Sequence, residues 1–71
     1  MAFWIKLTFD RALYIIDLDR IAAFYQTSTG RVAFSLSDES ITIVVNQQKD
    51  PDTYRMILNY IEQTTGHRLE E

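Results

Sequence analysis

Three aspartates in the first twenty residues are the densest group of side chains that could bind a metal ion. Asp17 and Asp19 are separated by one leucine, and Asp10 precedes them. A calcium-binding loop needs a longer run of oxygen ligands and a glycine at its sharp turn, and this segment has neither. Turn formation explains the three aspartates better than metal binding, so we expect no metal and no cofactor.

The side chains that could perform acid–base or nucleophilic chemistry are not arranged as a catalytic site. His67, the only histidine, follows the expected end of the last helix, where nothing predicts the order that a general base needs. Serines and threonines have no neighbouring base, and cysteine is absent, which excludes thiol nucleophiles, thiolate metal sites and disulfides. The chain has two glycines and no glycine-rich phosphate loop. We therefore expect no enzymatic activity and no small-molecule substrate.

Length and composition describe one small domain. The chain has 71 residues, of which 46% are hydrophobic and 24% charged, and its net charge of −3 has the wrong sign for a protein held to nucleic acid by bulk charge. Residues 1–6 lack the basic start and continuous apolar run of a signal peptide, and no segment approaches the roughly 20 apolar residues of a membrane span. We expect a cytoplasmic protein with no membrane contact.

Alternation of apolar and polar residues predicts five strands, over residues 3–9, 12–16, 21–26, 31–37 and 40–46. A two-residue turn at Asp10 and Arg11 would place Phe9 opposite Ala12. The same turn aligns Leu7 with Tyr14 and Ile5 with Ile16. Residues 17–20 are predicted to form a bend or a single helical turn.

Two further hairpins are predicted, around the loop 27–30 and around Asp38 and Glu39. The even loop lengths would pair Tyr25 with Val32, Ala23 with Phe34, Ile21 with Leu36, Leu36 with Ile41, Phe34 with Ile43, and Val32 with Val45. The predicted core of the sheet comprises Phe3, Ile5, Leu7, Phe9, Tyr14, Ile16, Ile21, Tyr25, Val32, Phe34, Leu36, Ile41, Ile43 and Val45.

A single helix is predicted after the strands. Asp50 is a good N-cap, Pro51 suits the first helical position, and Gly66 suits the left-handed C-terminal cap. The helix has one apolar stripe, formed by Tyr54, Ile57, Leu58 and Ile61. Met56 and Tyr60 would flank this stripe or form a second small contact surface. The expected fold is α+β: a five-stranded antiparallel meander in residues 1–66, curled toward a half-barrel, with the helix on one face and residues 67–71 as a disordered tail.

One helix covers one face of a sheet, so the opposite face is the candidate interaction surface. Its apolar and basic members are Trp4, Lys6, Leu13, Ile15, Phe24 and Arg31. Curling of the sheet, or folding of Trp4 over an edge, would bury part of this face inside the molecule. Otherwise the face is expected to bind a protein partner or a second copy of the chain.

Single-stranded nucleic acid is an alternative ligand for the same face. Bases would stack on Trp4 and Phe24, while Lys6 and Arg31 would contact phosphates. No RNP-type motif accompanies these residues, and the acidic composition opposes the interaction, so we consider nucleic-acid binding the weaker hypothesis.

The order of hydrophobic segments resembles that of a known bacterial family. Residues 5–8, Ile-Lys-Leu-Thr, are followed by Leu-Tyr-Ile at 13–15, a polar bend before Ile21, a hairpin, a strand and a terminal helix. This order resembles the small flagellar-associated proteins of the FlbD, or swarming-motility, type over residues 5–62. The typical Asn-Gly turn of that family is replaced by Asp10 and Arg11. The resemblance implies a small accessory or regulatory protein that acts by binding and has no catalytic residues.

Overall fold

The computed structural model describes residues 2–36 and 41–69, which form an α+β arrangement of five antiparallel strands and one C-terminal helix. Strands β1 (Trp4–Phe9) and β2 (Ala12–Asp17) form a two-stranded sheet. Strands β3 (Phe24–Gln26), β4 (Arg31–Ser35) and β5 (Thr42–Asn46) form a separate three-stranded sheet. The α+β class and the strand directions are confirmed, whereas the single five-stranded meander is wrong.

The division between the sheets follows from the segment after β2. The predicted helical turn is present as a 3₁₀ turn, η1 (Leu18–Arg20), and Leu18 is fully buried. Burying Leu18 bends the chain away from β2 before β3 begins at Phe24, so within the described residues β2 and β3 do not pair. The polar character of this segment hid Leu18, which was not predicted to be in the core.

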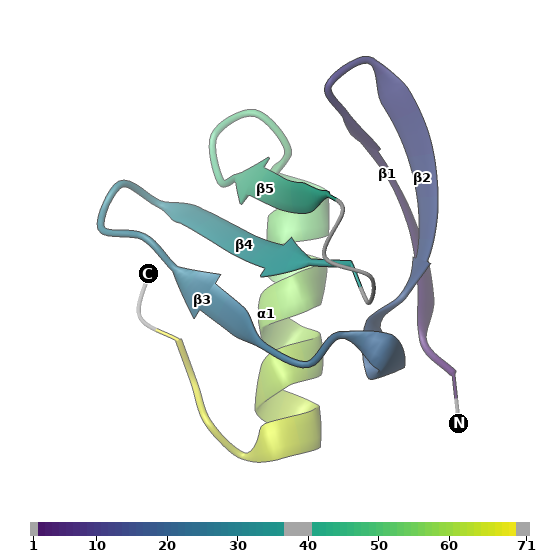
Figure 1. Cartoon of the computed structure of the whole chain (residues 1–71). Coiled ribbons are helices and arrows are strands. Elements are labelled where there is room, and N and C mark those ends of the chain that lie inside the picture. The colour runs from purple at the N-terminus through teal and green to yellow at the C-terminus, as the bar shows by residue number, and fades with distance from the viewer. Residues whose placement is uncertain (1, 37–40, 70–71) are drawn as a thin grey trace.

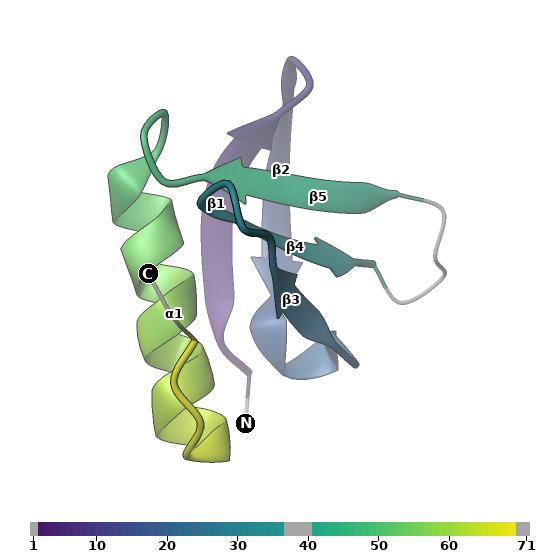
Figure 2. The same ribbon diagram turned by 90° about the vertical axis from the view of Figure 1, so that its left-hand side faces the viewer.

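The two sheets and the helix enclose one core. Helix α1 (Pro51–Thr65) lies behind the three-stranded sheet, and the β1–β2 hairpin stands beside them (Figure 1). A view from the side shows the hairpin strands running crosswise to β4 and β5 (Figure 2). All three parts contribute buried side chains to the core: Ile5, Leu7, Ile16, Leu18, Val32, Phe34, Ile43, Val45, Tyr54, Ile57, Tyr60 and Ile61.

The register of the first hairpin is as predicted. Phe9 lies opposite Ala12, Leu7 opposite Tyr14, and Ile5 opposite Ile16. Asp10 and Arg11 adopt positive φ angles of 53° and 66°, as both central residues of a type I′ turn do. The two-residue turn therefore fixes which side chains of the hairpin face the core.

The register of the second hairpin differs by one residue from the prediction. Phe24 pairs with Phe34 and Tyr25 with Ala33. The Thr27 amide donates to the Arg31 carbonyl at 2.8 Å, and Gly30 has a φ of 81°, so the loop has three residues, 28–30. A turn closed by a left-handed glycine is the usual three-residue hairpin loop, and its odd length exchanges the two faces of the strand.

This shift corrects the predicted core. The Tyr25 side chain is 53% exposed, whereas Phe24 is half-buried and packs against the core. Phe3, also predicted to be buried, is 39% exposed, although its ring lies 4.9 Å from that of Tyr60. The pairing of β4 with β5 is confirmed, with Phe34 opposite Ile43. The turn predicted at residues 38 and 39 lies outside the described residues.

The helix begins and ends where the sequence predicts. The Asp50 carboxylate accepts a hydrogen bond from the Thr53 amide at 3.3 Å, and Gly66 adopts a φ of 78° after the last turn. The predicted stripe faces the core, with Leu58 half-buried. Tyr60 is also buried, so it belongs to the core and not to a second contact surface.

Candidate functional site

Among the large hydrophobic residues that the structure describes, those on the outer face of the β1–β2 hairpin have the highest exposed fractions. We call Trp4, Lys6, Leu13 and Ile15 the hairpin face. Trp4 is 60% exposed, Leu13 63% and Ile15 66%. Lys6 lies opposite Ile15 in the ladder, so one cationic side chain stands among them.

Alternation along the strands explains why these residues remain in water. Ile5, Leu7 and Ile16 occupy the inner face and are buried in the core. Successive side chains of a strand point to opposite sides, so Lys6 and Ile15 must point outward. Turning this face inward would require a one-residue slip that expels the core residues.

The hairpin face offers enough apolar surface to contribute to binding. Burying one large aliphatic or aromatic side chain contributes about 1.5–3 kcal/mol. Trp4, Leu13 and Ile15 together would therefore favour association by several kcal/mol, before the cost of fixing two molecules. The four residues that the sequence placed here are all on this face.

A shallow groove of about 200 Å³ runs beside the hairpin face. It is lined by Trp4, Tyr14, Ile15, Ile16, Asp17, Arg20, Ile21 and Leu36. The lining includes Ile15 from the outer face of β2 together with Tyr14 and Ile16 from its inner face. The groove therefore follows the edge of β2 that faces away from β1.

The structure places the other two candidate residues elsewhere. The Phe24 ring packs against those of Phe34 and Tyr60, with centroid distances of 5.5 and 6.2 Å. Arg31 lies on β4, where its guanidinium donates to the Thr29 hydroxyl at 2.7 Å. Trp4 and Phe24 therefore do not form one aromatic platform.

The outer face of the three-stranded sheet carries fewer exposed large apolar side chains than the hairpin face. Tyr25 and Val44 flank Ala33, which is buried between them. Next along the strands, the hydroxyls of Ser35 and Thr42 are hydrogen-bonded at 3.1 Å. Tyr25 lies on this surface and not in the core, as predicted from an even loop, because the three-residue loop reverses the faces of β3.

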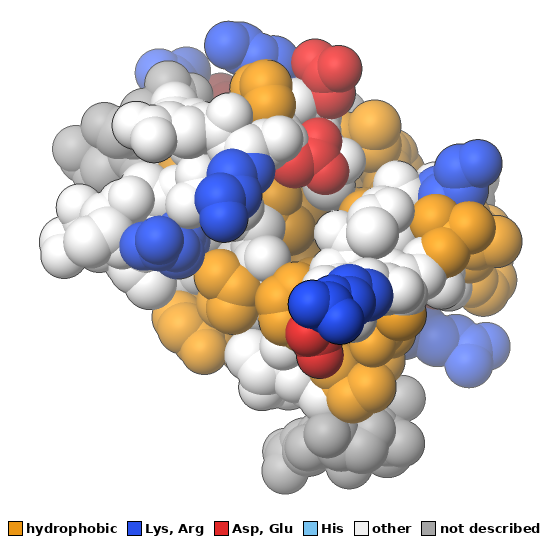
Figure 3. Space-filling model, turned by 90° about the horizontal axis from the view of Figure 1, so that it is seen from above, with side chains coloured by type: hydrophobic (Ala, Val, Ile, Leu, Met, Phe, Trp, Pro, Cys, Tyr) orange, Lys and Arg blue, Asp and Glu red, His pale blue; other side chains and the backbone are white. Residues whose placement is uncertain are grey.

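A second, larger groove of about 330 Å³ lies where the hairpin diverges from β5. It is lined by Thr8, Phe9, Asp10, Arg31, Val44, Val45, Asn46, Lys49 and Asp50. Charged side chains of both signs stand around hydrophobic atoms on this side of the molecule (Figure 3). Asp50 caps the helix and Arg31 binds Thr29, so two of its four charged groups already have structural roles.

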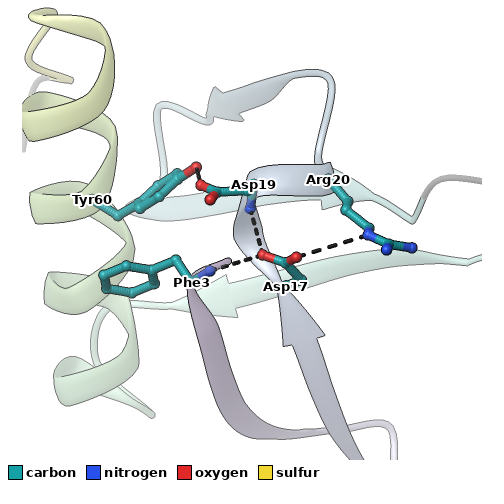
Figure 4. Close-up of polar contacts among 5 residues, drawn as sticks. All are labelled: Phe3, Asp17, Asp19, Arg20 and Tyr60. Atoms are coloured by element: carbon teal, nitrogen blue, oxygen red, sulfur yellow. Dashed lines mark hydrogen bonds and ion pairs between the residues drawn. The ribbon is translucent and has the colours of Figure 1, made fainter. Parts of the chain in front are cut away.

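The aspartates near η1 form a structural network. One oxygen of Asp17 accepts hydrogen bonds from the Phe3 amide at 2.9 Å and the Asp19 amide at 3.0 Å. The second oxygen of Asp17 lies 3.8 Å from the Arg20 Nε. These contacts join the start of β1 to the end of β2 (Figure 4).

Tyr60 connects this network to the helix. Its hydroxyl donates a hydrogen bond to the Asp19 carboxylate (Figure 4). Burial raises the pKa of Tyr60, and the hydrogen bond to Asp19 raises it further, because both favour the neutral phenol. The network anchors the hairpin to α1. Among the described residues, no group of three or more His, Cys, Asp or Glu side chains is placed to hold a metal ion.

No helix in the described part of the chain is both long and apolar enough to cross a membrane. Searches of protein-family models, curated proteins and solved structures find no match to this chain.

Proposed function

We propose that the protein is a non-enzymatic interaction module that binds a protein partner, or a second copy of itself, through the hairpin face. The observation that carries this proposal is the exposure of Trp4, Leu13 and Ile15 on one side of a hairpin whose other side is anchored in the core. Contiguous apolar residues on a rigid element are typical of the centre of a protein interface. The resemblance to FlbD-type proteins is in keeping with an accessory role of this kind.

Binding of single-stranded nucleic acid is the weaker candidate. This hypothesis requires two aromatic rings and two basic side chains on one face. The hairpin face holds one of each, Trp4 and Lys6. Stacking of successive bases requires successive aromatic groups along a basic groove. A protein interface needs only the apolar surface that the hairpin presents.

Site-specific photocrosslinking tests the proposal. A photoreactive phenylalanine analogue would replace Leu13 in one variant and Met56, which is 43% exposed on the helix, in a matched control. Both variants would be irradiated as purified protein and in extract of the source cells. We expect discrete protein adducts from position 13 and several-fold fewer from position 56. Equal labelling at both positions, or adducts with nucleic acid in place of protein, would overturn the proposal.

A further inference from the structure

The edge of β2 that faces away from β1 carries unpaired backbone groups. Within the described residues, β2 pairs with β1 alone. In a two-residue hairpin, the residues flanking the turn exchange hydrogen bonds, and bonded and non-bonded pairs then alternate along the ladder. Phe9 and Ala12 are such a flanking pair, so the next bonded pair is Leu7 with Tyr14. The pattern continues to the other end of the hairpin, where the Leu18 amide donates to the Phe3 carbonyl at 2.8 Å. Leu13 and Ile15 therefore direct their N–H and C=O groups away from β1.

The features that usually protect an exposed edge are missing from β2. Edge strands are commonly short, charged or interrupted by proline, because open backbone groups recruit other strands. β2 has the sequence Ala-Leu-Tyr-Ile-Ile-Asp over residues 12–17, with its single charge at the end. By contrast, the outer strands of the three-stranded sheet are β3, which has only three residues, and β5, which has five and contacts β1. The groove that follows β2 leaves part of its edge accessible.

We propose that β2 pairs in antiparallel fashion with β2 of a second copy, forming one continuous four-stranded sheet from two hairpins. This inference rests on the proposed function and names the partner. A two-fold axis perpendicular to the sheet would pass midway between Tyr14 of one copy and Tyr14 of the other, so that these two residues lie opposite each other. Leu13 of each copy would then exchange two hydrogen bonds with Ile15 of the other, which uses the unpaired groups of both residues.

Only one register satisfies both the backbone and the side chains. Opposite residues in a sheet point to the same side, so the two-fold axis must pass through a residue of β2. An axis at Leu13 would place Ile15 opposite Arg11, and an axis at Ile15 would place Leu13 opposite Asp17. An axis at Tyr14 pairs Leu13 with Ile15 across the interface, and apolar cross-strand pairs are the favourable ones.

The same register places no like charges opposite each other. With the axis at Tyr14, Arg11 at the turn of one copy lies opposite Asp17 of the other, whose carboxylate already accepts hydrogen bonds from the Phe3 and Asp19 amides. The hairpin faces of the two copies join on one side of the sheet, with Leu13 and Ile15 at the centre. Trp4 and Lys6 of both copies lie at the margins of this joined surface.

Sedimentation velocity over a range of protein concentrations tests the pairing. We expect wild-type protein to form a dimer as concentration rises. Ile15→Pro removes an edge N–H that β1 does not use, so the hairpin should fold, as circular dichroism would verify. The substitution deletes two of the four intermolecular hydrogen bonds, and we expect the dimer dissociation constant to rise by about thirty-fold or more. Met56→Lys on the helix is the control and should leave dimerisation unchanged.

Arg11→Glu keeps a residue with a side chain at the same positive φ and reverses the charge that faces Asp17, so it should also weaken the dimer. A wild-type chain that stays monomeric at all concentrations would overturn the pairing, while crosslinks from position 13 to another protein would leave the proposed function standing. A dimer that survives Ile15→Pro but is lost in Ile15→Lys would show face-to-face association, which also overturns the edge pairing. Loss of crosslinks from position 13 would instead overturn the proposed function itself.

Discussion

The two sheets of this protein present opposite kinds of outer surface although their inner faces share one core. On the hairpin, Trp4, Leu13 and Ile15 extend into solvent around Lys6. On the three-stranded sheet, the small Ala33 lies between its neighbours and is itself buried, and a pair of hydroxyls follows it. Stability requires only one face of each sheet, so the apolar outer face of the hairpin is surplus to folding.

The edges of the two sheets differ in the same direction. β2 offers six residues with apolar side chains on both faces, while β3 offers three and β5, which contacts β1, offers five. Gln26 at the end of β3 is also tied to the core side, since its side-chain amide donates to the Tyr54 hydroxyl at 2.8 Å. A long apolar edge favours pairing with another strand, whereas a short tethered edge disfavours it. This contrast supports the proposal that the hairpin is the associating region.

The largest expected effect contrasts a buried aromatic residue of β4 with an exposed one of β3. Phe34 is fully buried, and Phe34→Ala should lower the free energy of unfolding by about 3–5 kcal/mol, enough to unfold a domain of this size. Tyr25→Ala, on the outer face, should cost less than about 1 kcal/mol. Urea denaturation followed by circular dichroism would measure both. A cost at Tyr25 as large as that at Phe34 would contradict the observed register.

A smaller effect is expected where the helix holds the hairpin. Tyr60→Phe removes the hydrogen bond to Asp19 and should cost about 1.5–3 kcal/mol at neutral pH, since the acceptor is charged. The raised pKa of Tyr60 means that the folded state holds this proton above pH 10, where the unfolded chain releases it. The free energy of unfolding should therefore fall as the pH rises above about 10.

Denaturant titrations from neutral to alkaline pH would measure this dependence. In Tyr60→Phe, the free energy of unfolding should fall less steeply above pH 10, because the contribution of Tyr60 is gone. The ultraviolet absorbance change of one tyrosine that ionises late should also be lost. An unchanged pH profile in the variant would show that Tyr60 does not link the helix to the hairpin in this way.

The smallest effects are expected at the two turns, with opposite signs. Arg11 has a φ of 66°, a conformation that is unfavourable for any residue with a Cβ atom. Arg11→Gly should therefore stabilise the monomer by about 0.5–1 kcal/mol. Gly30→Ala should destabilise it by about 1 kcal/mol, because φ is 81° and the new methyl would lie 3.4 Å from the Gln47 side chain. Thermal unfolding at low protein concentration would measure both shifts. Two shifts of the same sign would contradict the turn assignments.

The turns also explain how far the sequence could predict the structure. Asp10 and Arg11 form a loop of two residues, so alternation alone gave the register of the first hairpin and placed Trp4, Lys6, Leu13 and Ile15 correctly on one face. At Gly30 the left-handed residue closes a three-residue loop, one residue shorter than predicted, and this difference places Phe24 against the core. A count of loop residues with Gly30 as the closing position would have given the observed faces.

The division into two sheets was harder to predict because it depends on burial of one side chain. Leu18 continues the alternation of Tyr14 and Ile16, but it lies between Asp17 and Asp19, where the sequence predicts a polar bend. Its burial in the core becomes evident only when the hairpin, the sheet and the helix are assembled. The helix caps at Asp50 and Gly66, by contrast, are local features that need no tertiary context.

Backbone amide exchange, measured by NMR at protein concentrations about a hundredfold apart, tests most directly whether the hairpin is the associating region. We expect the amides of Leu13 and Ile15 to exchange markedly more slowly at the higher concentration, while those of β3 exchange at the same rate at both. Unchanged exchange at Leu13 and Ile15, or slowing confined to β3, would show that the hairpin is not the associating region.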